Sequence, residues 1–435
     1  MRVLGFGQTC DLGSMYWRLG QAGHEVRVHI GDAGARDVYG GMLQLTDDWA
    51  ADLPWILEAG SDGVIVFETA EHGELQDELR HQGYQVIGGS AYGDRLEGDR
   101  EFGQQALCDV GLQTAPSHTF RDYDDAIGFI GRGGGRFVYK SNGAGAERCR
   151  NYVGQMDGGE DMLALLRQHK ARCDAEGRPD FVLMEHVEGI EVGVGAYFNG
   201  QRFLEGVCID FEHKRLFAGD VGELTGEMGT IVSYRGADTI FNMTLRRMED
   251  KLRAGGYCGY INLNLIANAQ GLWPLEFTSR FGYPGYAICE TLHLEPWEGI
   301  FRKMLDPTST SISTAAGFSA GVVLTVPPFP HADGYERLSK GLPVTLRDMT
   351  PMESQNLHFC EVAMIGGELV TSGHTGYVGV ATGAGNTVES AAAQAYALAR
   401  KVVVPNLGYR TDIGKEVAHA GIETLRSWGL VPRQF

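Results

Sequence analysis

The sequence predicts a chain of three or four subdomains built from α/β and α+β pieces. Its 435 residues are 43% hydrophobic, which is ample for a buried core but too long for one small domain. Helical and strand patterns alternate along much of the chain, as expected where sheets and helices pack in layers. The glycines at 133–135 and the Pro/Ser/Thr-rich residues 307–315 are the best candidates for linkers between subdomains.

Residues 1–97 form the first predicted subdomain, a small doubly wound sheet whose loops gather at one edge. Short apolar strands alternate with helices here, and the first strand runs into Gly5 and Gly7. The expected elements are the strand 2–6, the helix 13–21 and the strands 25–30, 63–67 and 85–87.

The remaining residues predict a core, a lid and a β-rich C-terminal domain. The expected helices are 98–112, 160–175, 238–254 and one near 387–401, and the expected strands are 137–140, 181–186 and 191–198. Residues 141–146 should form a loop of small side chains after one of these strands. The predicted division gives 98–134 with 199–310 to the core, 135–198 to the lid and 316–435 to the C-terminal domain.

Composition argues against several classes of partner. The formal net charge is −19 and no Lys/Arg-rich run occurs, so the chain should repel a nucleic-acid backbone. The eight cysteines stand singly, without CxxC or zinc spacing, as reduced thiols of a cytoplasmic protein do. We expect no signal peptide and no membrane-spanning helix. The predicted protein is cytoplasmic, with no nucleic-acid or membrane partner.

The loop after the first strand is the first candidate binding site. Gly5 and Gly7 begin a dinucleotide fingerprint, but the third glycine is replaced by Cys10, which argues against a nicotinamide site. The loop can still offer backbone N–H groups and a helix N-terminus to an anion. A tight turn without a ligand is the alternative, and an oxidoreductase function depends on these two glycines alone.

Two further segments could bind a nucleotide. Lys140 ends an apolar strand before the small-residue loop, where it could supply charge to phosphates, although an exposed lysine at a strand end is common. Residues 184–191 could form a hinge whose backbone meets an adenine edge and whose carboxylates meet an amino group or ribose hydroxyls. Within that hinge, His186 is expected to be structural.

Polar residues alternate with apolar ones in two adjacent predicted strands. Asn262 and Asn264 should lie opposite Glu276, Thr278 and Arg280 on one face. Buried polar side chains need partners, and a magnesium ion bridging ATP phosphates would be one. Arg280 could carry charge on a transferred phosphoryl group. A hydrogen-bonded structural network is the alternative interpretation.

Several segments carry motifs that occur together, and in this order, in one family. They are 96–102 (LEGDREF, as LEGSKAF), 137–140 (FVYK, as the IVIKADG strand), 184–191 (MEHVEGIE, as EEFLDGEE), 212–215 and 225–229 (EHKR and TGEMG, as DHKR and TGGMG), 275–284 (LEFTSRFGYP, as EFNVRFGDPE), and 387–389, 395–397 and 410–414 (as TVAEAQ, AY and RKDIG). Over nearly its whole length the chain thus resembles the phosphoribosylamine–glycine ligase (glycinamide ribonucleotide synthetase) family of the ATP-grasp superfamily.

The resemblance implies an ATP-grasp fold, with a preATP-grasp domain at the N-terminus, and roles for individual residues. ATP would be bound by Arg100 and Lys140 at the phosphates, by Glu185 and the backbone of Val187 at adenine and by Glu191 at ribose. Mg²⁺ or Mn²⁺ would be bound by Glu276, with Asn262 and Thr278 where relatives carry other ligands.

The resemblance also implies catalytic and substrate-binding residues. Arg280 and Lys140 would stabilise the acyl-phosphate chemistry. The substrates would contact Gly7, Gln8, Thr9, Asp11, Lys214 and Tyr283.

Departures from the family pattern concentrate at the substrate site. The N-terminal GxGGREHA motif is GFGQTCD at 5–11, without its Arg and His, and GPEAP is replaced by FETAE at 67–71. GDPE is GYPG at 282–285, which loses both carboxylates, and the loop at 142–147 lacks the family's second lysine. The motifs that bind ATP in the family are approximately retained, while those that bind phosphoribosylamine are replaced by other residues.

The predicted activity is that of an ATP-dependent ligase, which activates a carboxylate as an acyl phosphate and joins it to an amine. Its partners would be these small molecules, and the protein would be a monomer or homodimer. Formation of glycinamide ribonucleotide and the joining of an amino acid to a different amine both remain open. A non-catalytic ATP-binding or regulatory protein is the alternative, which Asn262, Thr278 and the missing loop lysine favour.

Overall fold

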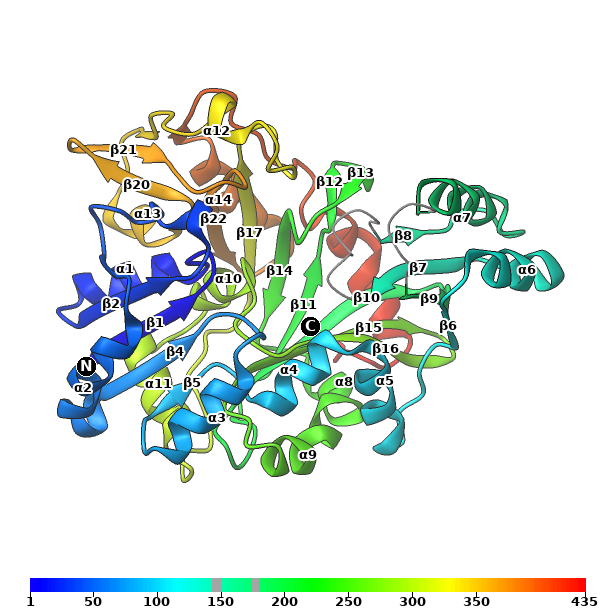
Figure 1. The fold of residues 1–435 in the computed structure, drawn as a ribbon, viewed down its shortest axis with the longest axis horizontal. Coiled ribbons are helices and arrows are strands. Elements are labelled where there is room, and N and C mark those ends of the chain that lie inside the picture. The colour runs from blue at the N-terminus through cyan, green and yellow to red at the C-terminus, as the bar shows by residue number, and fades with distance from the viewer. Residues whose placement is uncertain (143–150, 174–179) are drawn as a thin grey trace.

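The N-terminal residues form a five-stranded parallel sheet in the order β3-β2-β1-β4-β5. A computed structural model describes residues 1–142, 151–173 and 180–435 (Figure 1). The strands are β1 (Arg2–Gly7), β2 (Glu25–Ile30), β3 (Gln44–Thr46), β4 (Gly63–Phe67) and β5 (Val86–Ile87), and the helices are α1 (Gly13–Gln21), α2 (Leu53–Glu58), α3 (Gly73–His81) and α4 (Ala91–Gly98). The predicted doubly wound sheet is confirmed, and the continuous burial of β4 is typical of a parallel strand covered on both faces.

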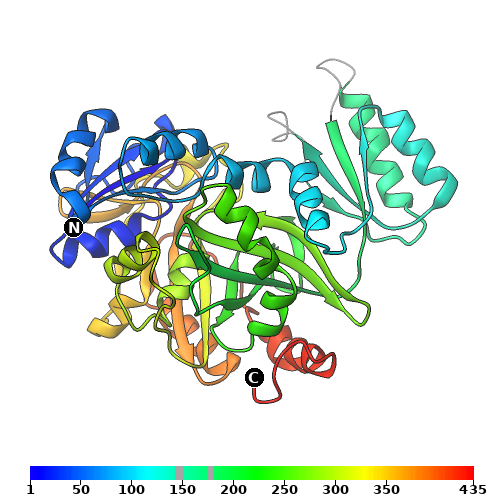
Figure 2. The same cartoon turned by 90° about the horizontal axis from the view of Figure 1, so that it is seen from below.

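A second sheet of four antiparallel strands, in the order β6-β9-β7-β8, stands apart from the rest of the molecule with α6 and α7 on one side (Figure 2). Its elements are β6 (Ser117–Phe120), α6 (Tyr123–Gly133), β7 (Phe137–Asn142), β8 (Tyr152–Val153), α7 (Glu160–Cys173) and β9 (Asp180–Glu185). The small-residue loop predicted at 141–146 lies outside the described residues from 143 onward.

The predicted lid boundaries, 135–198, differ from this arrangement. β6 and α6 precede residue 135 yet belong to the four-stranded sheet, because β6 pairs along its length with β9. Residues 190–198 instead pair with a strand of the large sheet. We propose that the lid spans 117–185, since strand pairing defines the unit better than the glycine run at 133–135 does.

The centre of the molecule is an eight-stranded antiparallel sheet in the order β16-β15-β10-β11-β14-β17-β22-β19. Its strands are β10 (Ile190–Phe198), β11 (Cys208–Glu212), β14 (Gly229–Ser233), β15 (Gly259–Asn268), β16 (Gly271–Thr278), β17 (Phe318–Thr325), β19 (Leu357–Phe359) and β22 (Tyr377–Gly385). The last three belong to the predicted C-terminal domain, 316–435. That region is rich in strands as predicted, but it extends the core sheet through the β14–β17 pairing rather than forming a sheet of its own.

Helices and short hairpins cover the large sheet. The helices are α5 (Arg100–Asp109), α8 (Asp238–Met243), α9 (Glu249–Ala254), α10 (Gly285–Glu290), α11 (Trp297–Leu305), α12 (Tyr335–Leu338), α13 (Pro351–Gln355), α14 (Val388–Ala399) and α15 (Ile422–Ser427). The hairpins pair β12 (Arg215–Phe217) with β13 (Val221–Leu224), and β20 (Val362–Ile365) with β21 (Glu368–Thr371), while β18 (Thr345–Leu346) pairs with β23 (Val402–Val403). The helix predicted at 238–254 is two helices joined by a 3₁₀ turn. Within the described part of the chain, no helix has the length and hydropathy needed to cross a membrane.

Candidate active site

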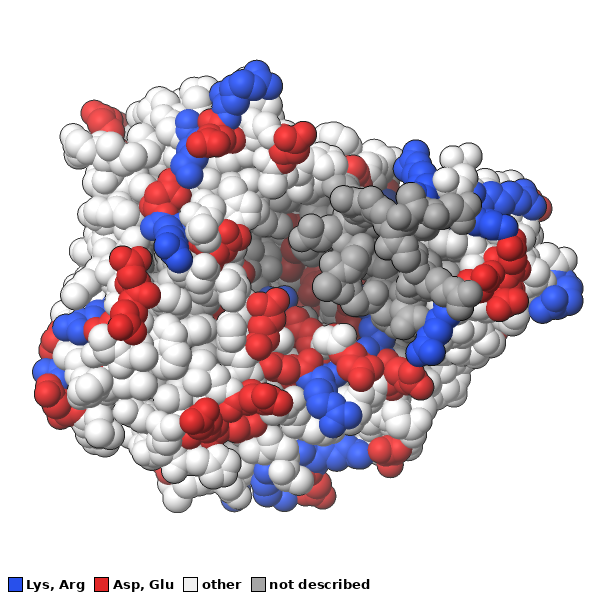
Figure 3. Space-filling model, in the orientation of Figure 1, with Lys and Arg blue, Asp and Glu red and all other residues white. Residues whose placement is uncertain are grey.

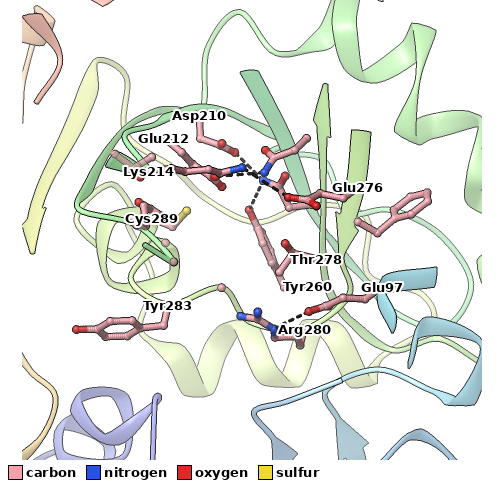
Figure 4. A pocket seen from close by; sticks show the side chains of 18 of the residues that line it. Glu97, Asp210, Glu212, Lys214, Tyr260, Glu276, Thr278, Arg280, Tyr283 and Cys289 are labelled. Atoms are coloured by element: carbon pink, nitrogen blue, oxygen red, sulfur yellow. Dashed lines mark hydrogen bonds and ion pairs between the residues drawn. The ribbon is translucent and has the colours of Figure 1, made fainter. Parts of the chain in front are cut away.

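A cavity of about 390 Å³ opens on the polar face of the large sheet. Along β15, Ile261 and Leu263 are fully buried in the core, while Tyr260, Asn262 and Asn264 line the cavity. This alternation is the two-residue period of a strand with one face on the core. Figure 3 shows Asp and Glu side chains gathered around the hollow, and Figure 4 shows the cavity from close by.

The strands β15 and β16 lie side by side, as the alternating polar residues predicted. Asn262 pairs with Thr278 and Asn264 with Glu276 in the antiparallel register. Thr278 and Glu276 line the same cavity. The proposition that two polar strands face one cavity is therefore confirmed.

Glu276 is the centre of an ion-pair cluster that joins the lid to the core. Its Oε2 lies 3.2 Å from both Arg100 Nη1 and Lys140 Nζ, and its Oε1 lies 3.6 Å from Lys214 Nζ. Arg100 belongs to α5, Lys140 to β7 of the lid, and Lys214 to the turn after β11. Three residues predicted for phosphates or substrate thus converge on the predicted metal ligand.

The charges of this cluster shift one another's pKa values. Burial raises the pKa of Glu276, but Lys140, Lys214 and Arg100 together outweigh it and hold that pKa well below its ordinary range. Burial lowers the pKa of Lys140, and Glu276 partly restores it. Lys214 is also paired with other carboxylates, so the positive charge available to an anionic ligand comes from Arg100 and Lys140, which share the single carboxylate of Glu276.

Lys214 connects this cluster to a second cavity of about 700 Å³. Its Nζ lies 2.7 Å from Glu191 Oε1 and 3.2 Å from Glu212 Oε2. Burial lowers the pKa of Lys214, but Glu212, Glu191 and Glu276 outweigh it and raise that pKa well above its ordinary value. Lys214 and Glu212 line both cavities, and Glu191 lines the larger one. The two cavities are therefore adjacent, with the side chains of Glu212 and Lys214 on the wall of each.

The structure places two of the predicted nucleotide contacts elsewhere. Glu185 is exposed at the end of β9, Val187 is half-buried, and neither lines the two cavities. The Glu185 backbone N–H donates to Pro116 O at 2.8 Å, so it is satisfied within the lid. His186 Nε2 lies 3.3 Å from Arg136 Nη2, a contact consistent with the structural role predicted for it.

Arg280 lines the cavity at the end away from Asp210, where Figure 4 shows it beside Glu97. Its Nε donates to Glu97 Oε1 at 3.2 Å, and the other carboxylate oxygen of Glu97 accepts from Ser279 N at 2.7 Å. Glu97 therefore orients the arginine, whose remaining N–H groups can meet an anion in the cavity.

The asparagine amides determine whether a magnesium ion fits. Asn262 Nδ2 donates to Asp210 Oδ2 at 2.6 Å, and Asn264 Nδ2 donates to Glu212 Oε2 at 3.2 Å. Both Oδ1 atoms are buried without a hydrogen-bond partner among the described residues. Magnesium takes few protein oxygens, so the Glu276 carboxylate with these amide oxygens fits it. Among the described residues no group of three or more His, Cys, Asp or Glu is placed to hold a metal, so substrate oxygens and water would complete the shell.

The predicted substrate loop curls around a buried acid instead of lining either cavity. The backbone N–H of Asp11 donates to Glu68 Oε2 at 2.8 Å, and Thr9 Oγ1 donates to Asp11 Oδ1 at 2.7 Å. A Cβ at Gly7 would lie 2.2 Å from Glu68 Oε2, so the loop needs glycine there. Gln8 Nε2 lies 3.2 Å from a ring nitrogen of His72.

Two tyrosines meet at the cavity wall. The ring of Tyr283, which lines the cavity, meets the ring of Tyr377 at 5.2 Å. Burial raises the pKa of Tyr377, and the neighbouring Cys360, Asp11 and Glu227 add to that effect.

Sequence reasoning missed several acids of the site. Cavity-lining carboxylates without a predicted role are Glu97, Asp210, Glu212 and Glu227. The alternation in the CIDFE strand, 208–212, could have placed two of them on one face. Glu227 lies before β14 and gives no local signal.

Known proteins share this fold and part of this sequence. Residues 98–286 match the family model of the phosphoribosylglycinamide synthetase ATP-grasp (A) domain. A phosphoribosylamine–glycine ligase from Pseudomonas aeruginosa is 26% identical over 95% of this chain and 97% of its own, and one from Streptococcus pneumoniae is 27% identical over 79% and 81%.

Solved structures show the same architecture. The phosphoribosylamine–glycine ligase of Thermotoga maritima superposes with a TM-score of 0.72 at 23% identity, over 95% of this chain and all of its own. The biotin carboxylase domain of the Hydrogenobacter thermophilus 2-oxoglutarate carboxylase, solved with MgADP, superposes with a TM-score of 0.63 at 11% identity, over 96% and 98%.

The fold and the match of residues 98–286 to the ATP-grasp (A) domain define an ATP-grasp protein. Within that superfamily the chain is similar to phosphoribosylamine–glycine ligases, and it is an ADP-forming, ATP-dependent ligase. The predicted fold class and superfamily are confirmed.

Proposed function

We propose that this ligase forms an amide between a small carboxylic acid and an amine other than phosphoribosylamine. The observation that carries the proposal is the Glu276 cluster, in which Arg100, Lys140 and Lys214 meet at a cavity that also holds Arg280. ATP phosphates would take over the three cations, since each phosphate oxygen is a stronger partner than a shared carboxylate. Glu276, released from them, would bind magnesium with the Oδ1 atom of Asn264, its partner in the strand register. The ion would neutralise charge on the phosphates.

The reaction has two balanced steps. The substrate carboxylate attacks the γ-phosphorus of ATP, so that an acyl phosphate forms and ADP leaves. The amine then attacks the acyl carbon, phosphate leaves, and the amine nitrogen loses a proton. Lys140 and Arg280 would stabilise charge on the transferred group, which is mainly electrostatic positioning. The lid that carries Lys140 would exclude water from the acyl phosphate.

The surroundings of the loop at 7–11 support a substrate without a phosphate. Phosphate sites are rich in N–H donors and cations. Next to the loop at 7–11 the structure has instead the buried Glu68 and the side chain of Asp11. The relatives named phosphoribosylamine–glycine ligases therefore indicate the type of reaction, while the amine that accepts the acyl group would differ.

The test is ADP release by the purified protein with Mg-ATP and a panel of acid–amine pairs. Glycine with phosphoribosylamine is the reference pair, and amino acids with unphosphorylated amines are the others. The proposal expects at least one unphosphorylated pair to exceed the reference by tenfold or more. Activity with the reference pair alone would contradict it.

A non-catalytic ATP-binding role is the second candidate, because two asparagines and a threonine stand where carboxylates would bind metal more strongly. It expects a thermal shift with ATP but no ADP release with any pair, and Glu276→Gln would then leave the protein's function unchanged.

A further inference from the structure

The end of the cavity farthest from Arg280 is lined by buried acceptors that lack partners. Asp210 Oδ1, Glu227 Oε1, Asn262 Oδ1 and Thr230 Oγ1 have no hydrogen-bond partner within the described part of the chain. These four side chains are 5%, 7%, 7% and 2% exposed. Buried polar atoms are normally satisfied, so unpaired atoms on the wall of one cavity indicate a missing ligand.

The strand β10 has glycines where these side chains cross it. β10 lies between β11 and β15, and its residues facing the cavity are Gly193 and Gly195. A Cβ at Gly193 would lie 2.1 Å from Asp210 Oδ1, and a Cβ at Gly195 would lie 1.9 Å from the Tyr260 hydroxyl. The bare backbone of β10 therefore lets Asp210 and Asn262 meet across it, at the 2.6 Å hydrogen bond.

The two carboxyl groups at this end have no ion-pair partner of their own. Neither Asp210 nor Glu227 lies within 4 Å of a cation among the described residues, whereas Glu212 pairs with Lys214 at 3.2 Å. Two buried acids without an adjacent cation are costly to ionise unless something bound there supplies the positive charge.

We propose that this end of the cavity is an ammonium subsite, which binds a second primary ammonium group, one that the substrate carries in addition to its α-amino group. The proposal deepens the ligase function and rests on it. An ammonium group has three N–H donors and one positive charge, which match the carboxylates of Asp210 and Glu227 and the amide oxygen of Asn262.

Glu227 is an addition to the motif at this point, because the TGGMG motif that 225–229 resembles has glycine in its place. The substrate is therefore an amino acid or amine that carries an additional ammonium group, which takes no part in formation of the amide.

The experiment measures binding to the full-length protein without ATP, so that it does not depend on turnover. The probes are 2,3-diaminopropanoate, 2,4-diaminobutanoate, ornithine and lysine, each compared by calorimetry with the neutral amino acid that lacks the terminal amine. We expect at least one diamino acid to bind tenfold or more tightly than its neutral counterpart. Equal affinities across the whole series would overturn the proposal.

Two isosteric variants, Asp210→Asn and Glu227→Gln, test the assigned side chains. Each should abolish the preference for the diamino acid and raise the melting temperature, because each removes a buried charge. The matched controls are Asp333→Asn and Glu336→Gln, at exposed positions in one surface segment. A preference that survives in both variants, or variants that melt well below the wild type, would show that these acids are structural partners.

The outcomes separate the subsite from the ligase reaction. A diamino acid that binds with the expected preference but stimulates no ADP release with any second substrate would leave the subsite standing and count against the ligase proposal. ADP release without any preference for an added ammonium group would support the ligase and overturn the subsite.

Discussion

Glu276 shows how much of this site depends on one side chain. Its carboxylate meets cations from α5, the lid and the turn after β11, so its replacement by Gln leaves Arg100 and Lys140 close together without a counter-charge, while Lys214 keeps Glu191 and Glu212. We expect Glu276→Gln to lower kcat/KM for ADP release by about 100-fold or more, since single groups in such sites contribute factors of this order. The control is the exposed Glu336→Gln, and a loss of less than about fivefold would argue that Glu276 does not take part in catalysis.

Glu68 makes stability depend on pH in a direction opposite to that of most carboxylates. Burial, reinforced by Asp11, raises its pKa from 4.5 to about 8. Between these values the folded protein holds a proton that the unfolded chain has lost, so the free energy of unfolding falls as pH rises, by at most about 5 kcal/mol. Urea denaturation at pH 5, 6.5 and 8 should show a shallower fall in Glu68→Gln.

The matched control for this measurement is Glu71→Gln, three residues away and exposed. Its pH profile should parallel that of the wild type. If Glu68→Gln also parallels the wild type, the carboxyl is ionised in the folded protein and the raised pKa is wrong.

Among single residues, the sequence predicted those whose chemical type fits a role in ATP binding or catalysis. It did not predict those whose role depends on which residues surround them in the folded protein. Glu276, Lys140 and Arg280 were predicted and line or touch one cavity. Asp210 and Glu227 were not, because their significance comes from the absence of a cation nearby, which depends on strands far apart in the sequence.

At the scale of elements, local sequence signals predicted where helices and strands begin and end, but they did not predict which distant strands pair. The helix 13–21 and the strands 25–30 and 63–67 have the predicted ends, since each is bounded by glycine or polar residues. The sequence assigned 191–198 to the lid, because the apolar pattern of β10 would suit a strand of either sheet. In the structure β10 pairs over nine residues with β15, which places it in the large sheet. Pairing partners are a property of the folded chain.

β10 offers a prediction at this scale. Gly193→Ala places a Cβ 2.1 Å from Asp210 Oδ1, and the carboxylate can rotate away because it is the end of a side chain. We expect a loss of the diamino-acid preference together with a modest cost in stability, about 1–2 kcal/mol, measured by calorimetry and urea denaturation. Gly131→Ala, on the exposed surface of α6 with open space around it, is the control and should match or exceed wild-type stability. Unchanged binding in Gly193→Ala would contradict the strand-crossing geometry.

For the whole molecule, the lid meets the core at the contact between Lys140 and Glu276 and along the larger cavity, while the helices α6 and α7 stand away from the large sheet (Figure 2). A nucleotide placed there would contact both units. We therefore expect a non-hydrolysable ATP analogue with Mg²⁺ to slow amide hydrogen exchange in β7 and β9, and to stabilise the protein by about 2.7 kcal/mol at a hundred times its Kd.

The same measurement distinguishes lid closure from general stabilisation. The N-terminal sheet, β1 to β5, should keep its exchange rates, because the phosphates would contact α5, β7 and the turn after β11. Lys140→Ala should reduce the protection of the lid strands, whereas Lys170→Ala, which removes a lysine that pairs with Asp124 inside the lid, should not. Protection spread evenly over both sheets, or equal protection in the two variants, would mean that the nucleotide does not join the lid to the core through Lys140.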